Sequence, residues 1–567
     1  MLVFTLLLAA LSPAAFAQAP DAVYFHANVV TLEAARPKAE AFAIRGGEFQ
    51  AIGSNDEMLK LAGPATRKVD LEGRTVIPGI VESHVHPIMA ALAEKDGPVP
   101  VMRSIAEVKV QLKKMAGSRP VSEVLFLPKV YSTRLTDRRY PTRYELDEAA
   151  PNHVALTDNG YASVLNSKAL AKLGITKDTP QPANGKIIKD AKGEPTGLIL
   201  GAAQLLGGYR RSKPPTVDDL KWALREMQKK YHEVGITSII DRGQTAEGFR
   251  TYQALRMAGE LTVRSNVTFL ISAQGTPDAV RAELERIPFV TGYGDDMLRV
   301  GSVKTIADGG ILIGTAFLRE PYGEHTEIYG YKDPDYRGVL SVSKENLAEM
   351  ARTALRLGWQ MTAHTTGGGA IDTLLEAYDA VDKETPIKGR RFTVTHGNFP
   401  SQESIERAAR LGVAFDCQPQ WYYFDTPALA PAFGPSRMKQ FQPLKTMLGK
   451  GVVVAGGSDH MIRFDSRDSI NPYNPFWGMW MTITRKTVDG STINPDEALT
   501  REQALALWTK NGAYLTFEEK RKGTIAAGKL ADFAVISDDL LTCPVDRIKD
   551  IEALRTVVGG REVWLRR

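Results

Sequence analysis

Cysteine is nearly absent from this sequence. The 567 residues include two, Cys417 and Cys543, which lie far apart. Thiolates with this separation cannot supply the paired ligands of a cysteine-rich metal site. We expect Cys417 to be a buried thiol.

Long runs of charge of one sign are also missing. The 71 basic and 66 acidic residues leave a formal net charge of +5, with no basic block and no acidic tail. Nucleic acid and anionic membranes are therefore poor partners, and a small-molecule substrate is expected instead. With 43% hydrophobic and 24% charged residues, the chain is globular in composition, and it is long enough for one large barrel-type domain and a smaller companion.

A short apolar segment opens the chain. Residues 1–17 are almost wholly apolar and end in Ala-Phe-Ala, the small-x-small pattern typical of a cleavage site. A membrane-spanning helix would need about 20 apolar residues. We predict a signal peptide over residues 1–19, cleaved near Ala17 or Ala19, and a periplasmic or secreted protein that leaves the membrane after cleavage. Signal peptides normally open with Lys or Arg, but the first basic residue here is Arg36, which points to an upstream start codon. The alternative to a signal peptide is a buried N-terminal strand.

Both ends of the chain have the pattern of short strands and turns. Residues 20–75 hold apolar runs at 22–25 and 41–44, and residues 520–567 hold a matching run at 531–536. Strands this short cannot bury their apolar faces alone. We predict a small β-sandwich built from both chain ends.

The middle of the chain alternates strand-like apolar runs with helical patterns, which is typical of βα units around a parallel sheet. Helical patterns cover residues 217–234, 344–357 and 402–411. We predict a (β/α)₈ barrel over residues 76–519, with an insertion at about 96–215. After a first strand that ends near residue 86, its strands are expected at 235–241, 265–272, 299–308, 359–365, 391–397, 412–418 and 451–459.

The first barrel strand ends in His84-Val85-His86. Side chains at positions i and i+2 of a strand point to the same face, so both imidazoles aim at one spot. Imidazole is the commonest transition-metal ligand, and a strand that holds two of them favours a metal site. The alternative is a pair of surface histidines beside a turn at Pro87.

The other strands support the metal interpretation, because the active site of such a barrel lies at the carboxyl ends of its strands. Four of the nine histidines are predicted to stand at this rim. Scattered structural histidines would not converge in this way. The residues that the predicted strands present at this rim are His84, His86, Lys304, His364, His396 and Asp459.

Further motifs accompany these residues. They are GKII at 185–188, GEPTG at 193–197, VK at 303–304 with DG at 308–309, GSD at 457–459, GTIAAGKLAD at 523–532 and TVVGG at 556–560. Together they resemble the metal-dependent amidohydrolase superfamily, specifically the amidohydrolase-3 branch related to N-substituted formamide deformylases. The resemblance covers nearly the whole mature chain.

The resemblance implies a centre of two divalent metal ions. His84, His86 and Asp459 would hold one ion, His364 and His396 would hold the other, and Lys304, carboxylated by carbon dioxide, would bridge them. Burial and nearby cations both lower the pKa of a lysine, and a neutral amine can form this carbamate. A lysine that reaches the rim or pairs with Asp308 is the alternative. Zinc best suits imidazole and oxygen ligands, while iron, manganese and nickel remain open.

The implied activity is hydrolysis of a non-peptide C–N bond, of the amide type, by a metal-activated hydroxide. Asp459 would be both a ligand and the catalytic residue that moves the proton to the leaving nitrogen. Hydrolysis of an ester or lactone on the same site is an alternative, and so is a non-catalytic binding or regulatory protein that retains the fold. The complete ligand set favours catalysis.

Two departures from the family pattern concern the pocket wall. Relatives usually carry His at the position of Tyr161, and Gly-Asp-Arg-Ala where this chain has Gly-Gly-Gly-Ala at 367–370. We expect the glycines to leave open, mobile space beside His364, for a bulkier or differently charged substrate. Oligomeric state is unassigned, with a homodimer left open. Candidate substrate contacts are Tyr161, Asp308, Tyr322, His325, Trp421 and His460.

Overall fold

The computed structural model describes residues 19–95, 97–182, 185–201, 205–206, 214–323, 326–330 and 333–567. Most of the predicted signal segment, residues 1–18, and the predicted contact His325 lie outside these ranges. Within the ranges, no helix combines the length and apolar character that crossing a membrane requires.

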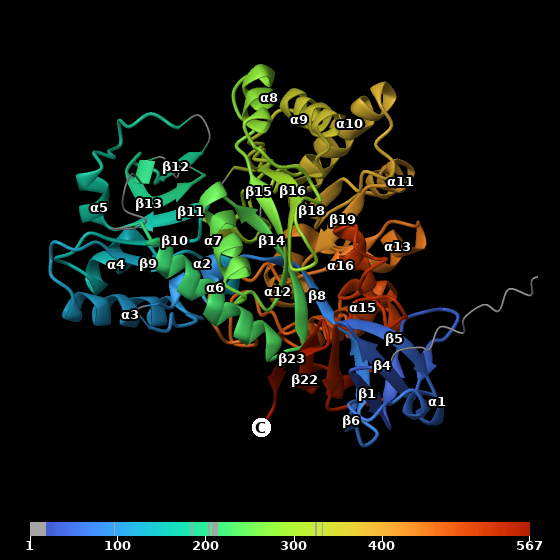
Figure 1. Cartoon of the computed structure of the whole chain (residues 1–567). Helices are drawn as coiled ribbons and strands as arrows, with labels where there is room; N and C mark the ends of the chain where they lie inside the picture. Colours follow the sequence, from blue (N-terminus) through green and yellow to red (C-terminus); the bar gives the residue numbers. More distant parts are fainter. Residues whose placement is uncertain are drawn as a thin grey trace, which may run out of the picture.

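An eight-stranded sheet forms the centre of the molecule (Figure 1). Each strand pairs in parallel with its neighbours, in the order β20-β19-β18-β17-β16-β15-β14-β8. A parallel bridge between Val85 of β8 and His460, in the segment after β20, brings the two edges of the sheet together. The predicted (β/α)₈ barrel is therefore confirmed. Its strands are β8 (Ile80–Val85), β14 (Ile236–Gln244), β15 (Arg264–Leu270), β16 (Leu298–Ile306), β17 (Met361–Thr365), β18 (Thr393–His396), β19 (Ala414–Cys417) and β20 (Val454–Gly456).

Local sequence signals delimit the helices around the barrel. The Ser343 side chain caps the first turn of α9, and Gly358 ends that helix in the left-handed conformation at φ 83°. The predicted helices at 344–357 and 402–411 coincide with α9 and α11. The helices are α2 (Pro87–Ala93), α6 (Val217–His232), α7 (Ala246–Met257), α8 (Pro277–Glu285), α9 (Lys344–Leu357), α10 (Gly368–Glu384), α11 (Gln402–Leu411), α12 (Pro419–Met438), α13 (Leu444–Gly449), α14 (Pro475–Thr484), α15 (Arg501–Leu507) and α16 (Lys510–Leu515).

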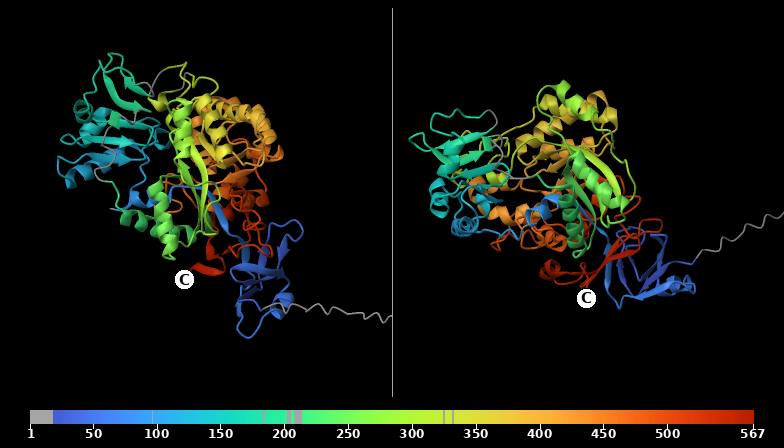
Figure 2. Two further views of the ribbon diagram at one scale, coloured as in Figure 1. Left: turned by 45° about the horizontal axis from the view of Figure 1, so that its top comes forward. Right: turned by 60° about the vertical axis from the view of Figure 1, so that its left-hand side comes forward.

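Two further sheets join the ends of the chain at one side of the barrel (Figure 2). Strand β21 pairs antiparallel with β7, so the C-terminal segment completes a sheet begun by the N-terminal one. Between the sheets, the ring of Phe533 packs edge-on against Tyr24 and Phe42 at centroid distances of 5.1 and 5.0 Å. The small domain predicted from both chain ends is therefore present. Its sheets are β5-β4-β1-β6 and β23-β22-β21-β7-β2-β3, with strands β1 (Ala22–Phe25), β2 (Asn28–Val30), β3 (Lys38–Ala39), β4 (Ala41–Arg45), β5 (Glu48–Gly53), β6 (Arg67–Asp70), β7 (Thr75–Pro78), β21 (Phe533–Ile536), β22 (Ala553–Val558) and β23 (Arg561–Leu565), and helix α1 (Asn55–Lys60).

A five-stranded sheet lies in the inserted part of the chain, on the side of the barrel opposite the chain ends in Figure 1. Its apolar residues share one core cluster with Ile313, Phe399 and Trp421, which follow barrel strands. This packing places the insertion over the carboxyl rim of the barrel. Its elements are β9 (Leu125–Pro128), β10 (Ala155–Asp158), β11 (Ala162–Leu165), β12 (Lys186–Lys189) and β13 (Pro195–Leu200), with α3 (Ile105–Ser118), α4 (Arg143–Ala149) and α5 (Ser167–Lys172).

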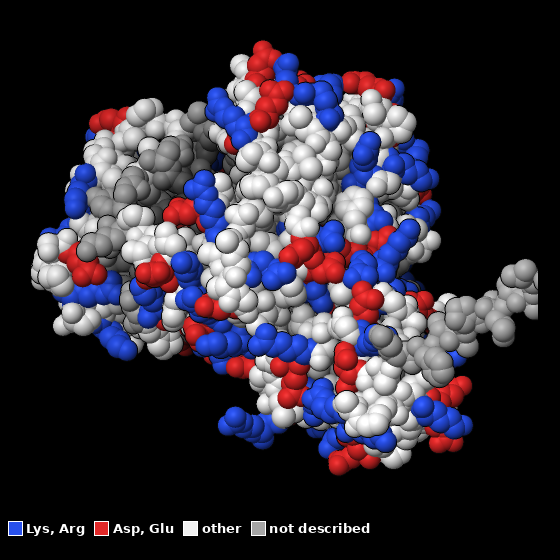
Figure 3. All heavy atoms as spheres, in the orientation of Figure 1, with Lys and Arg blue, Asp and Glu red and all other residues white. Residues whose placement is uncertain are grey.

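Basic and acidic side chains alternate over the face shown in Figure 3, without a large area of one sign. The Cys417 side chain is fully buried, as expected.

Candidate metal centre

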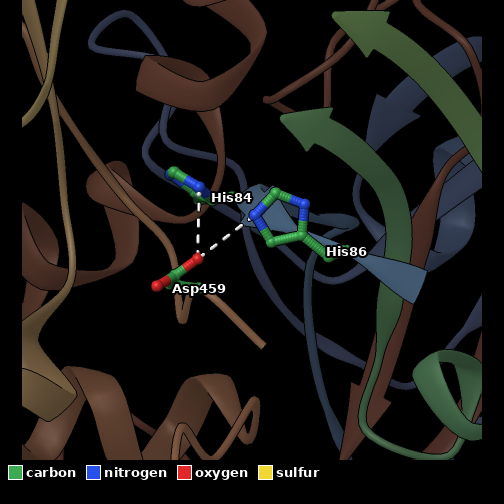
Figure 4. Close-up of side chains that lie close together, drawn as sticks. All are labelled: His84, His86 and Asp459. Carbon is green, nitrogen blue, oxygen red and sulfur yellow. Dashed lines mark ion pairs between the residues drawn. The ribbon is translucent and has the colours of Figure 1, made fainter. Parts of the chain in front are cut away.

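Three predicted ligands meet at the carboxyl rim of the barrel (Figure 4). The Asp459 Oδ1 atom lies 3.3 Å from Nε2 of His84 and 3.3 Å from Nε2 of His86. The ligand atoms of these residues lie within 4.8 Å of one another. Two imidazole nitrogens and a carboxylate oxygen at this spacing fit a divalent metal ion.

The backbone is strained at two candidate ligands. Asp459 and His396 adopt positive φ values of 56° and 74°, a region that residues other than glycine rarely occupy. Conformations of this kind persist where the surrounding structure holds them, and they cluster at functional sites. For Asp459, the backbone N–H donates to the His84 carbonyl at 2.8 Å and the carbonyl accepts from Asn471 at 2.8 Å. These bonds hold the Asp459 carboxylate toward the histidines.

Strand β19 and the residue directly after it supply two buried side chains, Asp416 and Gln418, that orient the histidines. Asp416 Oδ2 accepts a hydrogen bond from Nδ1 of His84 at 2.9 Å, which leaves Nε2 of His84 as the free ligand atom. Gln418 Oε1 accepts from Nδ1 of His396 at 2.7 Å. Arg242 contacts the same Asp416 oxygen at 3.1 Å. Sequence reasoning missed Asp416 and Gln418, although their i, i+2 spacing in a predicted buried strand is a signal that could have found them.

Asp241, on β14, is a further buried carboxylate that the sequence did not single out. Its Oδ2 atom accepts from the Tyr252 hydroxyl and the Gln244 amide, both at 2.7 Å. Its Oδ1 atom lies 3.9 Å from Nδ1 of His86. Asp241 thus lies on the Nδ1 side of His86, as Asp416 lies on the Nδ1 side of His84.

The remaining predicted ligands lie beside this group. The rings of His364 and His396 approach to a centroid distance of 4.3 Å, and His84 stacks on His396 at 4.9 Å. The Lys304 ammonium nitrogen lies 3.4 Å from Nε2 of His84. The Nε2 atom of His364 donates to the Gly309 carbonyl at 3.2 Å, which leaves its Nδ1 atom unprotonated. The fold therefore brings all six predicted ligands to one rim.

Burial sets the protonation of these groups. It lowers the pKa of Lys304 to about 8, because the charged ammonium loses its hydration. Burial, followed by the charge of Lys304, lowers the pKa of His364 to about 3 and also lowers that of His84. Both imidazoles are therefore neutral near pH 7, as metal ligands must be.

A cavity of about 240 Å³ opens beside the ligands. His86, Lys304, His364, His396 and Asp459 form its polar end. The remaining wall is mostly apolar and combines barrel loops with the insertion; it includes Met89, Tyr131, Tyr161, Leu270, Ile306, Leu312, Ile313, Trp421 and Met461. A cavity of this kind suits a small, largely apolar ligand.

Two of the predicted substrate contacts line this cavity. The Tyr161 ring lies 5.9 Å from that of His364, and the Trp421 ring stacks on His396 at 4.6 Å. Tyr161 is partly buried, and the loss of hydration at the cavity raises the pKa of its phenol well above the usual value.

Three other predicted contacts are not among the residues that line the cavity. The buried carboxylate of Asp308 accepts the backbone N–H groups of residues 317, 366 and 367, at 2.8 to 3.0 Å. The Tyr322 hydroxyl donates to the Ala316 carbonyl. The His460 ring is held between Tyr231 and the Arg463 carbonyl. These side chains organise the loops around the site.

The three glycines at 367–369 do not leave open space, contrary to the expectation from the sequence. A Cβ atom on Gly368 would lie 2.3 Å from the Arg319 guanidinium, and one on Gly367 would lie 2.1 Å from the Phe317 carbonyl oxygen. Arg319 fills this region and pairs with Asp372. The glycines therefore permit a close approach of the β16–α9 loop, which explains why side chains are excluded here.

A (β/α)₈ barrel with histidines and an aspartate at its carboxyl rim has the fold and the ligand types of a metal-dependent hydrolase. Residues 67–564 match the Amidohydrolase family, and the chain belongs to it. The resemblance seen in the sequence is thereby confirmed.

Known proteins agree with this assignment over nearly their full lengths. The amidohydrolase YtcJ of Bacillus subtilis (strain 168) is 28% identical over 565 residues, which cover 96% of this chain and 99% of that protein. The N-substituted formamide deformylase of Arthrobacter pascens is 28% identical over 559 residues, covering 96% and 98%. The crystal structure of an uncharacterized metal-dependent hydrolase from Pyrococcus furiosus has the same fold, with a TM-score of 0.66 at 22% identity over 92% of this chain and 100% of the other.

Proposed function

We propose that this protein hydrolyses the C–N bond of a small, non-peptide amide, with two divalent metal ions, most suitably zinc. The observation that carries the proposal is the convergence of His84, His86 and Asp459 with Lys304, His364 and His396 at one cavity. The N-substituted formamide deformylase relative supports an amide of the formamide type. When bound, the metal ions supply a Lewis acid and an activated water.

Asp459 is the residue suited to move the proton. Its Oδ1 atom faces the two histidines, and Oδ2 lies 3.4 Å from the Asn471 amide. A carboxylate held at this place accepts a proton from the attacking water and delivers it to the leaving nitrogen. Asn471 keeps the carboxylate oriented through this exchange.

Tyr161 is suited to stabilise the carbonyl oxygen. It lines the cavity from the insertion, beside His364. Because burial raises its pKa, the phenol stays protonated across the neutral range and can donate a hydrogen bond to the oxygen that gains charge during the reaction. A histidine at this position would keep one N–H donor but would lose its positive charge in the same range.

Lys304 is suited to bridge the metal sites as a carbamate. Its lowered pKa, about 8, leaves a fraction of the amine neutral at physiological pH, and neutral amine reacts with carbon dioxide. The product carries two oxygens and a negative charge, which complement cations on either side.

The proposal is tested with zinc-loaded protein and two matched substrate series, N-alkyl formamides and the corresponding alkyl formates. We expect hydrolysis of the formamides, lost in His84→Ala and His364→Ala together with bound metal, while circular dichroism shows a retained fold. Cleavage of the formates alone would instead favour an esterase. Full activity in metal-depleted protein would contradict the proposal.

A further inference from the structure

A second cavity, of about 270 Å³, adjoins the metal centre. Lys129 and Tyr131, which follow β9 of the insertion, line both cavities. The two spaces therefore meet at these side chains. Lys129 and Tyr131 form the shared wall of the two cavities, and a long substrate with its amide at the metal ligands would pass these two side chains to reach the second cavity.

The second cavity differs from the first in charge. Among its described lining residues, five are basic and one, Asp468, is acidic. The basic residues are Arg103, Lys129, Arg134, Arg138 and Arg467. Its apolar wall includes the aromatic rings of Phe424 and Trp477. The lining therefore combines a positive field with surface for an apolar stem.

The basic residues differ in how their charges are balanced. Arg134 binds both oxygens of the buried Asp425, at 2.5 and 2.9 Å, so its charge is neutralised within the protein. Arg103 lies 3.0 Å from Asp468. Arg138 donates to the Thr133 carbonyl, and no carboxylate in the described part of the chain forms an ion pair with it.

Arg138 lines the cavity and is exposed to solvent. It adopts a positive φ of 51°, and its N–H donates to the Leu135 carbonyl at 3.1 Å. The hydrogen bond from its guanidinium to the Thr133 carbonyl holds the side chain at the cavity. A guanidinium with unused donors beside an apolar wall matches the planar, two-oxygen geometry of a carboxylate.

We propose that the second cavity binds a carboxylate at the far end of the substrate, so that the natural substrate is an N-acyl or N-formyl compound with an apolar stem ending in a carboxylate. This inference rests on the proposed amide hydrolysis at the metal centre. It makes Arg138 a residue that sets specificity.

The test compares linear ω-formamido carboxylates of increasing chain length with the ω-formamido carboxamides of equal length. Using zinc-loaded protein, we expect kcat/KM to favour the carboxylate for chains long enough to reach Arg138, and added salt to reduce this preference. In Arg138→Gln the preference falls about three- to tenfold, and Arg138→Lys restores part of it. Arg250→Gln, which removes an exposed arginine on α7, is the matched control and retains the full preference.

A binding experiment separates this inference from the proposed activity, because it needs no hydrolysis. Calorimetry measures the affinities of 4-phenylbutyrate and 4-phenylbutyramide for the same three variants. We expect weaker binding of the carboxylate in Arg138→Gln alone. Equal kcat/KM for both substrate series at every chain length, or equal 4-phenylbutyrate affinity in Arg138→Gln and Arg250→Gln, would overturn the inference while amide hydrolysis stood. If neither series is hydrolysed, the proposed activity fails, and the calorimetric comparison still decides whether the cavity binds a carboxylate.

Discussion

The Nδ1 atom of His84 lies 2.9 Å from Oδ2 of Asp416, although 332 residues separate them in the sequence. Both side chains are fully buried, and the Ser83 hydroxyl and Arg242 also contact the Asp416 carboxylate. This carboxylate fixes the tautomer of His84 and directs its Nε2 atom toward Asp459.

Loss of the Asp416 charge should therefore weaken metal binding. We expect Asp416→Asn to lower metal affinity about 10- to 100-fold, because the imidazole loses its orienting, electron-donating partner. Competition with a chromophoric chelator measures this affinity. Asp496→Asn, at an exposed site, is the control. Equal affinities in the two variants would show that Asp416 does not orient the ligand.

Replacement of Lys304 should show whether this residue bridges two metal ions as a carbamate or only packs at the rim. In Lys304→Ala, two cations would face each other without the negative bridge, so metal content and rate should both collapse. Acetate or propionate should restore activity in a concentration-dependent way by supplying two oxygens, while chloride at equal ionic strength should not. Both ions still tightly bound to Lys304→Ala would contradict the bridging role.

The phenol of Tyr161 should affect kcat more than KM. We expect Tyr161→Phe to lower kcat about 100-fold, the loss typical of one hydrogen bond to a developing oxyanion. Tyr161→His should regain part of this loss and add an ionisation near neutral pH to the rate profile, because imidazole titrates there. Tyr293→Phe, at an exposed position, is the control. Unchanged kcat in Tyr161→Phe would remove this residue from the mechanism.

Acid should destabilise the barrel through His232, at the end of α6. Nδ1–H donates to the Ile236 carbonyl and Nε2 accepts from the Thr262 hydroxyl, each at 2.9 Å, so the neutral ring is satisfied. Burial lowers the pKa of His232 to about 4. The unfolded chain, with a pKa near 6.5, binds the proton more readily, so stability is full above about pH 6.5 and declines toward pH 4, by about 3 kcal/mol.

Urea denaturation of wild type and His232→Gln across this pH range measures the effect. The variant loses some stability at neutral pH through imperfect packing, but its free energy of unfolding should depend less on pH between 4 and 6.5. Parallel pH profiles for the two proteins would assign the acid sensitivity to other groups.

Export is a further proposal from the first residues. If the Ala-Phe-Ala pattern at 15–17 is cleaved, the mature protein in a Gram-negative host begins near Gln18 or Pro20 and fractionates with the periplasm. N-terminal mass spectrometry of the fractionated protein checks this. Cytoplasmic protein that retains Met1 would refute it.

The sequence by itself determined the features that depend on local spacing. The i, i+2 separation of His84 and His86 places both on one face of a strand, whatever the rest of the fold. Caps such as Ser343 and Gly358 determined the bounds of helices. The grouping of the six residues at one rim followed because the carboxyl ends of barrel strands converge for geometric reasons once eight strands are recognised, while their roles as ligands came from the resemblance to the family.

Only the tertiary structure decided how side chains far apart in the sequence are paired. Asp308 and His460 follow barrel strands as the ligands do, but their side chains have other partners. The Asp308 carboxylate accepts backbone N–H groups, and the His460 ring binds residues of neighbouring loops. The glycines at 367–369 suggested free space, whereas Arg319 from another loop fills it. The wall that Lys129 and Tyr131 share between two cavities depends on how the insertion packs on the barrel, which is a long-range contact that no local pattern encodes.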